Sequence, residues 1–270
     1  LVDVVAIGFV DGSTGFATAF REILQRIESA GFSVSASRSW GKTLSPAGGD
    51  LDDSARNMQS CIARWTAAPR SGPVELVFLP LHRLPRHARQ DRYRIAIAEF
   101  EAQDVPSAYA TRLNAFDEIW SPSEAGAEAL QRSGVTTAIR WMPHGVDTDV
   151  FLPGSRDEES LWITTTGLRV LTVAIFEPRK GYDVLLRAAM SSLGPDDDLL
   201  LAGHRTTPGR IRELAATFPS KRGFTPEQII VAPLELPRRD IARLYRTADV
   251  FALPTRGEGD GLPLREALAS

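Results

Sequence analysis

The 270-residue sequence contains a single cysteine, Cys61, so no intramolecular disulfide can form. Disulfides are typical of oxidising compartments, and their exclusion favours a reducing one. We therefore interpret Cys61 as a small buried apolar residue. Lysine is scarce as well, because arginine carries almost all of the positive charge and lysine occurs only at Lys42, Lys180 and Lys221. This scarcity makes the position of each lysine more informative.

The sequence also lacks an excess of positive charge. Its formal net charge is −3 at pH 7, whereas nucleic-acid binding normally shows as a basic excess. We therefore expect no nucleic-acid partner. No apolar run reaches the roughly 18–20 residues that a membrane-spanning helix needs, and residues 1–10 lack the basic start of a signal peptide. Together these absences predict a cytoplasmic protein.

The composition that remains is ordinary for a globular protein, with 43% hydrophobic and 24% charged residues. The length suits two domains better than one compact core. Residues 147–160 are polar and include Pro153 and Gly154, a composition typical of a linker. We therefore predict an N-terminal domain over 1–146, a linker over 147–160 and a C-terminal domain over 161–270.

Apolar, β-branched runs alternate with segments in which apolar residues recur at helical spacing. In the N-terminal half we expect strands at 2–9, 32–36, 74–79 and 119–121, and helices at 16–29 and 124–133. Ser123 suits the N-cap of the second helix and Gly134 the position past its end. In the C-terminal half we expect strands at 169–175, 199–202, 228–231 and 250–253, and helices at 182–192, 208–218 and 238–247. This alternation predicts an α/β fold of parallel sheets with helices on both faces.

In such sheets, ligands bind beyond the carboxyl ends of the strands, so residues that directly follow strands are candidate site residues. The clearest candidate segment is 254–270, PTRGEGDGLPLREALAS, which follows the strand expected at 250–253. Gly257, Gly259 and Gly261 allow the backbone to approach a ligand closely. Pro263 suits the first position of a helix.

This segment places Glu258 in a loop and Glu266 in the first turn of the helix, so both carboxylates can face one crevice. Carboxylates accept hydrogen bonds from sugar or ribose hydroxyls, and backbone N–H groups can donate to the same hydroxyls. The segment therefore indicates a site for a polyhydroxylated ligand. The alternative for Glu266 alone is that it complements the helix macrodipole, an effect of about 0.3–1 kcal/mol.

A second candidate segment is 176–181, FEPRKG, which lies between a strand and the helix that begins near Tyr182. Arg179 and Lys180 place positive charge at the positive end of a helix dipole, which is unfavourable unless an anion binds there. A diphosphate would relieve this repulsion. The alternative is a basic turn that is solvated and binds nothing.

With these two segments, the sequence resembles family 4 of the retaining glycosyltransferases, which have the GT-B fold of two Rossmann-like domains. The hallmark of that family is a Glu, seven residues, Glu pattern, matched here by Glu258 and Glu266. Three further stretches agree, WSPS at 120–123, PHGVD at 143–147 and RKGYDVLLRA at 179–188. The resemblance is strongest over 116–270. Family members usually continue beyond this point, so we expect the second domain to be incomplete at its C-terminus.

The resemblance implies that Lys180 contacts the diphosphate of a nucleotide-sugar donor and that Glu266 holds its ribose. It places Glu258 beside the transferred sugar. Many members carry an arginine five residues before the lysine, where this chain has Ile175, and Arg179 is the candidate to replace it.

Three further backbone positions are implied in the donor site. Gly261 and Leu262 would meet the sugar hydroxyls, and Gly181 belongs to the turn that carries the lysine. The family needs no metal, and we expect no cofactor other than the nucleoside diphosphate sugar as co-substrate. Two cations and a helix N-terminus can offset the charge of a leaving diphosphate, as a divalent ion does elsewhere. The acidic run at 196–198 is interpreted as a solvated turn.

The N-terminal half offers weaker candidates. The loop Gly12, Ser13, Thr14, Gly15 resembles the first-strand loop of the family, which lines the cleft near the phosphates and the acceptor, yet a plain strand-to-helix turn is an equal interpretation. The four histidines, at 82, 87, 144 and 204, have no metal-ligand spacing, and His144 is expected to have a structural role.

Arginines cluster between residues 81 and 94 against one acidic residue, Asp91. They are Arg83, Arg86, Arg89, Arg92 and Arg94. A solvated helix face is one interpretation, and a patch that contacts an anionic acceptor or a membrane surface is the other. Glu99 and Glu101 follow this cluster, and the sequence assigns no role to either.

The sequence therefore predicts a retaining hexosyltransferase that uses a nucleoside diphosphate sugar and an unknown glycan, lipid or small-molecule acceptor. The expected protein is cytoplasmic, with membrane association as an option. Two alternatives stay open. One is a GT-B sugar-nucleotide epimerase, which would convert the donor without an acceptor, and the other is a non-catalytic nucleotide-sugar-binding fragment.

Overall fold

The computed structural model describes residues 2–11, 15–38, 53–85, 91–154, 166–203, 207–232 and 236–270. The chain divides into two compact units, each with its own parallel sheet. The first unit is Leu1–Gly145 with Glu258–Asp260, and the second is Val146–Gly257 with Gly261–Ser270. Within these described ranges, no helix combines the length and the apolar character that a bilayer crossing requires.

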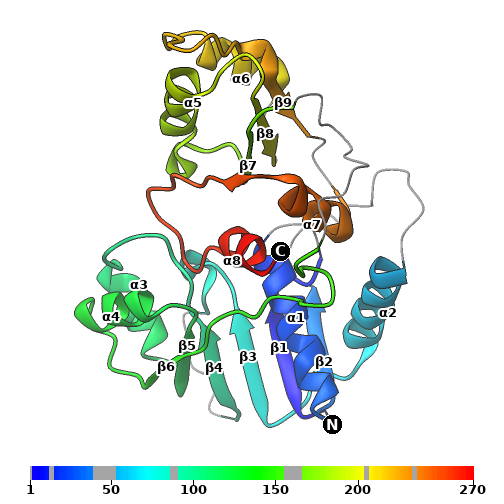
Figure 1. Ribbon diagram of the computed structural model, residues 1–270. Coiled ribbons are helices and arrows are strands. Elements are labelled where there is room, and N and C mark those ends of the chain that lie inside the picture. Colours follow the sequence, from blue (N-terminus) through cyan, green and yellow to red (C-terminus); the bar gives the residue numbers. More distant parts are fainter. Residues whose placement is uncertain are drawn as a thin grey trace. The chain divides into compact units, whose positions relative to one another are not determined.

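The first unit contains a six-stranded parallel sheet in the order β2-β1-β3-β4-β5-β6 (Figure 1). Its strands are β1 (Val4–Gly8), β2 (Val34–Arg38), β3 (Val74–Phe78), β4 (Tyr93–Ile97), β5 (Glu118–Ser121) and β6 (Ile139–Trp141). Its helices are α1 (Gly15–Ser29), α2 (Asp53–Ala67), α3 (Ser107–Leu113) and α4 (Glu124–Arg132). The predicted strands and helices of this half are confirmed, and β4, β6, α2 and α3 are additional elements.

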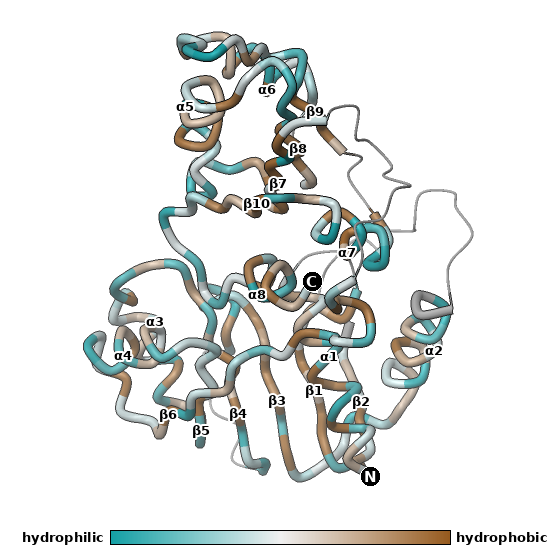
Figure 2. The backbone as a smooth tube through the Cα atoms, in the orientation of Figure 1, coloured by the Kyte–Doolittle hydropathy of each residue, from teal (hydrophilic) through white to brown (hydrophobic). Residues whose placement is uncertain are grey.

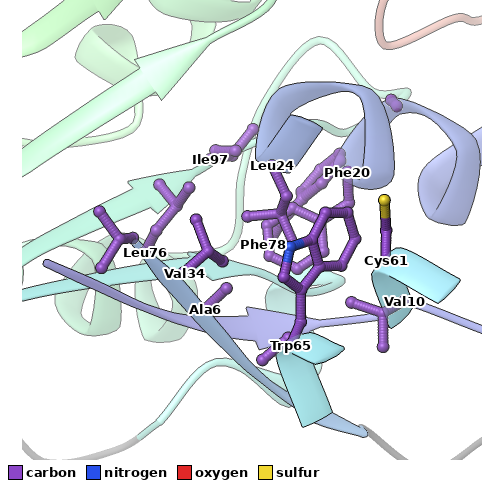
Figure 3. Close-up of a cluster of buried hydrophobic side chains, with 13 residues drawn as sticks. Ala6, Val10, Phe20, Leu24, Val34, Cys61, Trp65, Leu76, Phe78 and Ile97 are labelled. Atoms are coloured by element: carbon purple, nitrogen blue, oxygen red, sulfur yellow. The ribbon is translucent and has the colours of Figure 1, made fainter. Parts of the chain in front are cut away.

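Alternating side chains of the first sheet point to two separate hydrophobic clusters, as the period of two in a strand requires. One cluster joins Ala6 and Phe78 to α1 and α2, with Trp65 of α2 fully buried in it (Figure 3). Cys61 is buried in the same cluster, as predicted. The opposite face packs against α3 and α4 through residues such as Ile119. Both faces of the sheet are therefore covered by helices, which is the Rossmann-like arrangement.

The second unit contains a four-stranded parallel sheet in the order β10-β7-β8-β9. Its strands are β7 (Arg169–Val173), β8 (Asp198–Ala202), β9 (Ile229–Val231) and β10 (Val250–Phe251). Its helices are α5 (Tyr182–Ser192), α6 (Pro208–Ala215), α7 (Arg238–Thr247) and α8 (Leu262–Ala269). The alternation predicted for this half is confirmed, and the bounds of α5 and α7 agree with the predicted 182–192 and 238–247.

The second sheet also separates two hydrophobic clusters. Leu199 and Leu201 face α5 and α6, whereas Leu171 and Leu200 face α7. All five residues of β8 are buried, and the four that follow Asp198 are apolar, as is typical of a central parallel strand (Figure 2). The structure therefore has two Rossmann-like units, the fold class that the sequence predicts.

Helix α4 shows how local sequence sets these boundaries. The Ser123 hydroxyl accepts a hydrogen bond from the backbone N–H of Gly126, so Ser123 is the N-cap. Gly134 follows the helix with a φ of +90°, a left-handed conformation that glycine adopts at low cost. Both predicted boundary roles are confirmed.

Two interpretations of charged segments are wrong for some of their residues. Arg94 and Arg92 do not lie on an exposed face, because β4 carries Arg94 into the sheet, where its side chain is 1% exposed. The side chain of Arg92 is 10% exposed. Arg83 is exposed, and Arg86 and Arg89 lie outside the described residues. The run 196–198 is not a simple solvated turn either, because Asp198 is buried at the start of β8.

Pairing explains why Arg94 can be buried. Glu75 of β3 lies opposite it in register, and the Arg94 Nε donates to a Glu75 carboxylate oxygen at 2.9 Å. The Arg94 guanidinium also donates to the Ala115 carbonyl at 3.2 Å and lies 4.3 Å from the centroid of the Phe116 ring. A buried charge is tolerated only with such partners.

We predict that Arg94→Met lowers the free energy of unfolding by about 3–5 kcal/mol, because it leaves the Glu75 carboxylate buried without its main partner. The double variant Glu75→Leu/Arg94→Met removes both charges and should recover most of that loss. Urea denaturation followed by tryptophan fluorescence measures both. A loss below about 1 kcal/mol in the single variant would contradict this account.

Candidate active site

The second sheet has a topological switch point between β7 and β10. From β7 the chain moves to β8 and β9 on one side, and β10 then pairs with β7 on the other side, so the strand order reverses between β7 and β10. Crevices at switch points, beyond the carboxyl ends of the strands, are where open α/β sheets bind ligands. The two segments selected from the sequence, 176–181 and 254–257, follow β7 and β10 and therefore lie at this end of the second sheet.

The segment after β7 forms a tight turn. Pro178–Lys180 is a short 3₁₀ helix, and Gly181 follows with a φ of +71° as the N-cap of α5. A Cβ at Gly181 would overlap the carbonyl oxygen of Pro254, which lies just beyond β10. Glycine is therefore required at 181 for two reasons, the left-handed backbone and the close approach of the second segment.

Hydrogen bonds tie the two segments together. The Arg179 guanidinium donates to the Gly257 carbonyl at 2.7 Å, and the Arg256 backbone N–H donates to the Arg179 carbonyl at 2.8 Å. The Thr255 hydroxyl lies 3.3 Å from the same Arg179 carbonyl. The structure thus confirms that the two segments selected from the sequence meet. Lys180 lies in this turn and is half-buried.

Sequence reasoning did not find the ion pair that reinforces this contact. Arg256 donates to both carboxylate oxygens of Asp183, at 3.0 and 2.8 Å, and to the Pro178 carbonyl at 2.6 Å. These hydrogen bonds hold the pKa of the Asp183 carboxyl below its ordinary value. In the sequence, Asp183 is simply the residue that follows Gly181 and Tyr182. No sequence pattern relates it to Arg256.

Glu266 lies in α8, and its position corrects the sequence interpretation. The helix begins at Leu262, so Glu266 is in its second turn and does not complement the N-terminal end of the dipole. The residue is 8% exposed, and its carboxylate accepts a hydrogen bond from the Tyr245 hydroxyl at 3.2 Å and lies 3.9 Å from the Arg238 guanidinium. Two side chains of α7 therefore hold this carboxylate in place.

The environment of Tyr245 determines the protonation state of its hydroxyl in this contact. Burial, followed by the negative charge of Glu266, raises the pKa of the Tyr245 hydroxyl well above its ordinary value. The hydroxyl therefore stays protonated and donates to the carboxylate. The sequence placed Tyr245 only within the helix expected at 238–247, and it did not predict the contact with Glu266.

The loop residues Glu258–Asp260 belong to the first unit. A Cβ at Gly259 would overlap the side chain of Glu99, which follows β4. Glu99 Oε2 lies 3.3 Å from Nε2 of His144, whose ring lies 5.7 Å from the centroid of the Phe78 ring. His144 is buried, in keeping with its expected structural role. Glu99, which sequence analysis left unassigned, thus contacts the loop that carries Glu258.

Other predicted site residues have different outcomes. Gly12, Ser13 and Thr14 lie outside the described residues, and Gly15 is the first residue of α1, one residue before the expected helix start. Of the histidines, His87 and His204 are also outside the described residues. Across the described part of the chain, no group of three or more His, Cys, Asp or Glu side chains is arranged to hold a metal ion.

Comparison with known proteins relates this site to a family. The sequence matches the family described as glycosyl transferases group 1 over residues 167–270, the region that contains β7, β10 and both segments of the site. Residues 167–270 are a glycosyl transferases group 1 domain. The fold of the whole chain is that of GT-B glycosyltransferases, as the solved structures show.

Curated relatives cover part of the chain. D-inositol 3-phosphate glycosyltransferase of Acidothermus cellulolyticus is 33% identical over 144 residues, which are 48% of this chain and 31% of that protein. The protein of the same name from Mycolicibacterium smegmatis is 33% identical over 128 residues, 46% of this chain and 29% of that protein. The matched segments thus span about a third of the length of these relatives.

Solved structures extend the similarity of fold to the complete chain. Sucrose-phosphate synthase from Thermosynechococcus elongatus has a TM-score of 0.71 at 16% identity and covers 99% of this chain and 79% of that one. The Anabaena protein Alr3699/HepE, solved with UDP and glucose, has a TM-score of 0.65 at 12% identity and covers 100% of this chain and 78% of that one. At this identity the similarity establishes the fold alone.

We predict that Gly181→Ala separates the two segments of the site. Gly134→Ala is the matched control, because Gly134 also has a positive φ but a Cβ there meets no other described atom within 4 Å. The control should lose about 1–2 kcal/mol of stability from the left-handed backbone alone. Gly181→Ala should lose more and, in the donor site that we propose below, should bind UDP or GDP at least about tenfold more weakly in calorimetry. Equal losses with unchanged nucleotide binding would contradict the close contact.

For the donor site that we propose below, we predict that Tyr245→Phe weakens nucleotide binding about tenfold, because a hydrogen bond to a charged group contributes about 1.5–3 kcal/mol and fixes Glu266. Tyr182→Phe is the control, since its buried hydroxyl donates to the Ala174 carbonyl instead. Titration calorimetry with UDP and GDP compares the two variants. Similar affinities would show that Tyr245 does not position Glu266 for binding.

Proposed function

We propose that the protein transfers a hexosyl group from a nucleoside diphosphate sugar to an acceptor hydroxyl, with retention of the anomeric configuration. The single observation that carries this proposal is the meeting of the turn at 178–181 with the loop at 254–257 at the switch point of the second sheet. The first segment supplies cations and the second opens into the glycine-rich loop. This combination suits a ligand that is both anionic and hydroxylated.

Each half of the ligand has its own group of residues in this proposal. Lys180 and Arg179 offset the charge of the diphosphate at the N-terminal end of α5. Glu266, held by Tyr245 and Arg238, accepts hydrogen bonds from the ribose hydroxyls. A carboxylate accepts hydrogen bonds only, so a fixed Glu266 carboxylate suits a ligand that carries hydroxyl donors.

The sugar itself is assigned to the glycine-rich loop. Backbone groups of Gly261 and Leu262 and the side chain of Glu258 are proposed to contact its hydroxyls. In the reaction, the bond from the anomeric carbon to the diphosphate breaks and the nucleoside diphosphate leaves with the electron pair. A bond from the acceptor oxygen to the same carbon forms, and the proton of the acceptor hydroxyl passes to the departing diphosphate. The residues that would stabilise the leaving group are cations of the chain, so we propose that no metal is required.

The relatives support the class of reaction and suggest probes. The curated proteins act, by their names, on D-inositol 3-phosphate, and one solved structure of this fold contains UDP and glucose. UDP- and GDP-sugars are therefore the first donors to test. The acceptor is proposed only as a hydroxyl of a glycan, lipid or small molecule, and the protein as cytoplasmic.

We predict that Lys180→Ala lowers turnover by about two orders of magnitude or more while the melting temperature stays near that of the wild type, because its proposed charge acts on the leaving diphosphate. The matched control is Lys221→Ala. Among the described residues, Lys221 is the other lysine of the second unit, and it is exposed. Release of nucleoside diphosphate with and without added acceptors measures the effect, and product analysis separates transfer from epimerisation. Near wild-type turnover in Lys180→Ala would refute the role.

A further inference from the structure

Arg256 is exposed, yet it makes several hydrogen bonds to the turn of the proposed donor site. Its guanidinium binds both oxygens of Asp183 in the first turn of α5, and the same group donates to the Pro178 carbonyl. Its backbone N–H donates to the Arg179 carbonyl. One residue thus makes four hydrogen bonds to the segment 178–183, on both sides of Lys180.

The contribution of these contacts to the stability of the fold is too small to explain them. The side chains of Arg256 and Asp183 are about half exposed, at 50% and 48%, and ion pairs of this kind contribute little to folding because water screens them. An acidic residue in the first turn of α5 would complement the helix dipole without any arginine. The specific feature here is geometric, because a planar guanidinium fixes a carboxylate in a two-pronged pair and leaves little freedom in orientation.

The turn needs such an external constraint. It is three residues long, it ends in a left-handed glycine, and it carries two cations at the positive end of α5. Short 3₁₀ helices have poor hydrogen-bond geometry and stabilise themselves weakly. Repulsion between the cations and the dipole opposes the conformation further. Arg256 binds the turn through two backbone carbonyls and, through Asp183, the helix that follows it.

We propose that Arg256, paired with Asp183, is a positioning residue that holds the turn at 178–181 in the geometry that binds a diphosphate. This inference rests on the proposed function, since it concerns the same site. Loss of the pair lowers nucleotide affinity by letting the turn move, and it changes the stability of the fold little. The pair acts as one unit, so the effects of removing either partner are not additive.

The test compares Arg256→Gln, Asp183→Asn and the double variant with a control ion pair that is also two-pronged. Arg64 and Glu28 of the first unit form an exposed two-pronged pair, with contacts of 2.8 and 3.3 Å. Glu28→Gln therefore removes a similar ion pair far along the chain from the site. Calorimetry with UDP, GDP and inorganic pyrophosphate measures affinity, and hydrogen exchange reports on the Lys180 and Gly181 amides, which donate to Glu177 and Pro178.

Each single variant of the pair is expected to bind the nucleotide about tenfold more weakly, with no greater loss in the double variant. Arg256→Lys should recover only part of the affinity, because an ammonium cannot form the two-pronged pair. Exchange at Lys180 and Gly181 should quicken in Arg256→Gln and stay unchanged in Glu28→Gln. Arg256→Lys keeps the test informative if a harsher variant fails to fold.

Two negative outcomes are distinguishable. If the wild type binds the nucleotides but Arg256→Gln and Asp183→Asn bind them as Glu28→Gln does, the positioning role is overturned and the proposed function stands. If the wild type binds none of the three probes, the proposed function fails. Hydrogen exchange then decides separately whether Arg256 holds the turn, and unchanged exchange at both amides overturns that role as well.

Discussion

The contact on which the candidate site depends is the approach of the Gly181 backbone to the Pro254 carbonyl oxygen. Strands β7 and β10 are neighbours in the sheet, so the segments that follow them leave from the same edge. A side chain at 181 would force these segments apart, and the hydrogen bonds of Arg179, Thr255 and Arg256 could not form. The absence of one Cβ therefore permits the arrangement of the surrounding polar groups.

A second constraint holds the carboxylate of Glu266. It lies on α8 but takes its orientation from α7, through Tyr245 and Arg238. Functional carboxylates need this support, because a site residue held by its own rotamer alone is poorly fixed. Tyr245, which supports Glu266, is buried in the core. Arg256, which contacts the turn at 178–181, is exposed. The proposed diphosphate and ribose contacts are thus positioned by different physical means.

Much of the second unit was predictable because its sequence obeys simple rules. Apolar strands such as β8 alternate with helices, and the glycines and cations that follow β7 and β10 stand out from the background. Topology then determined where they lie, because carboxyl ends of parallel strands share one edge. The placement of 178–181 next to 254–257 was therefore available from the sequence.

The misinterpretations arose where a charged residue is buried or where a contact spans long sequence distances. Strand β4 was read as part of a basic surface, because the pairing of Arg94 with Glu75 depends on strand register and leaves no local signal. The pair of Arg256 with Asp183 spans 73 positions and the contact of Tyr245 with Glu266 spans 21. Pattern and propensity describe neighbours in sequence, whereas these side chains meet only after the sheet has formed.

The most direct test of the account is a crystal structure of the protein grown with UDP or GDP. The account predicts that the diphosphate lies within hydrogen-bonding distance of the Lys180 ammonium, beside the first turn of α5, with the ribose hydroxyls on the Glu266 carboxylate. A nucleotide bound elsewhere on the second unit, with Lys180 and Glu266 both out of reach, would contradict it.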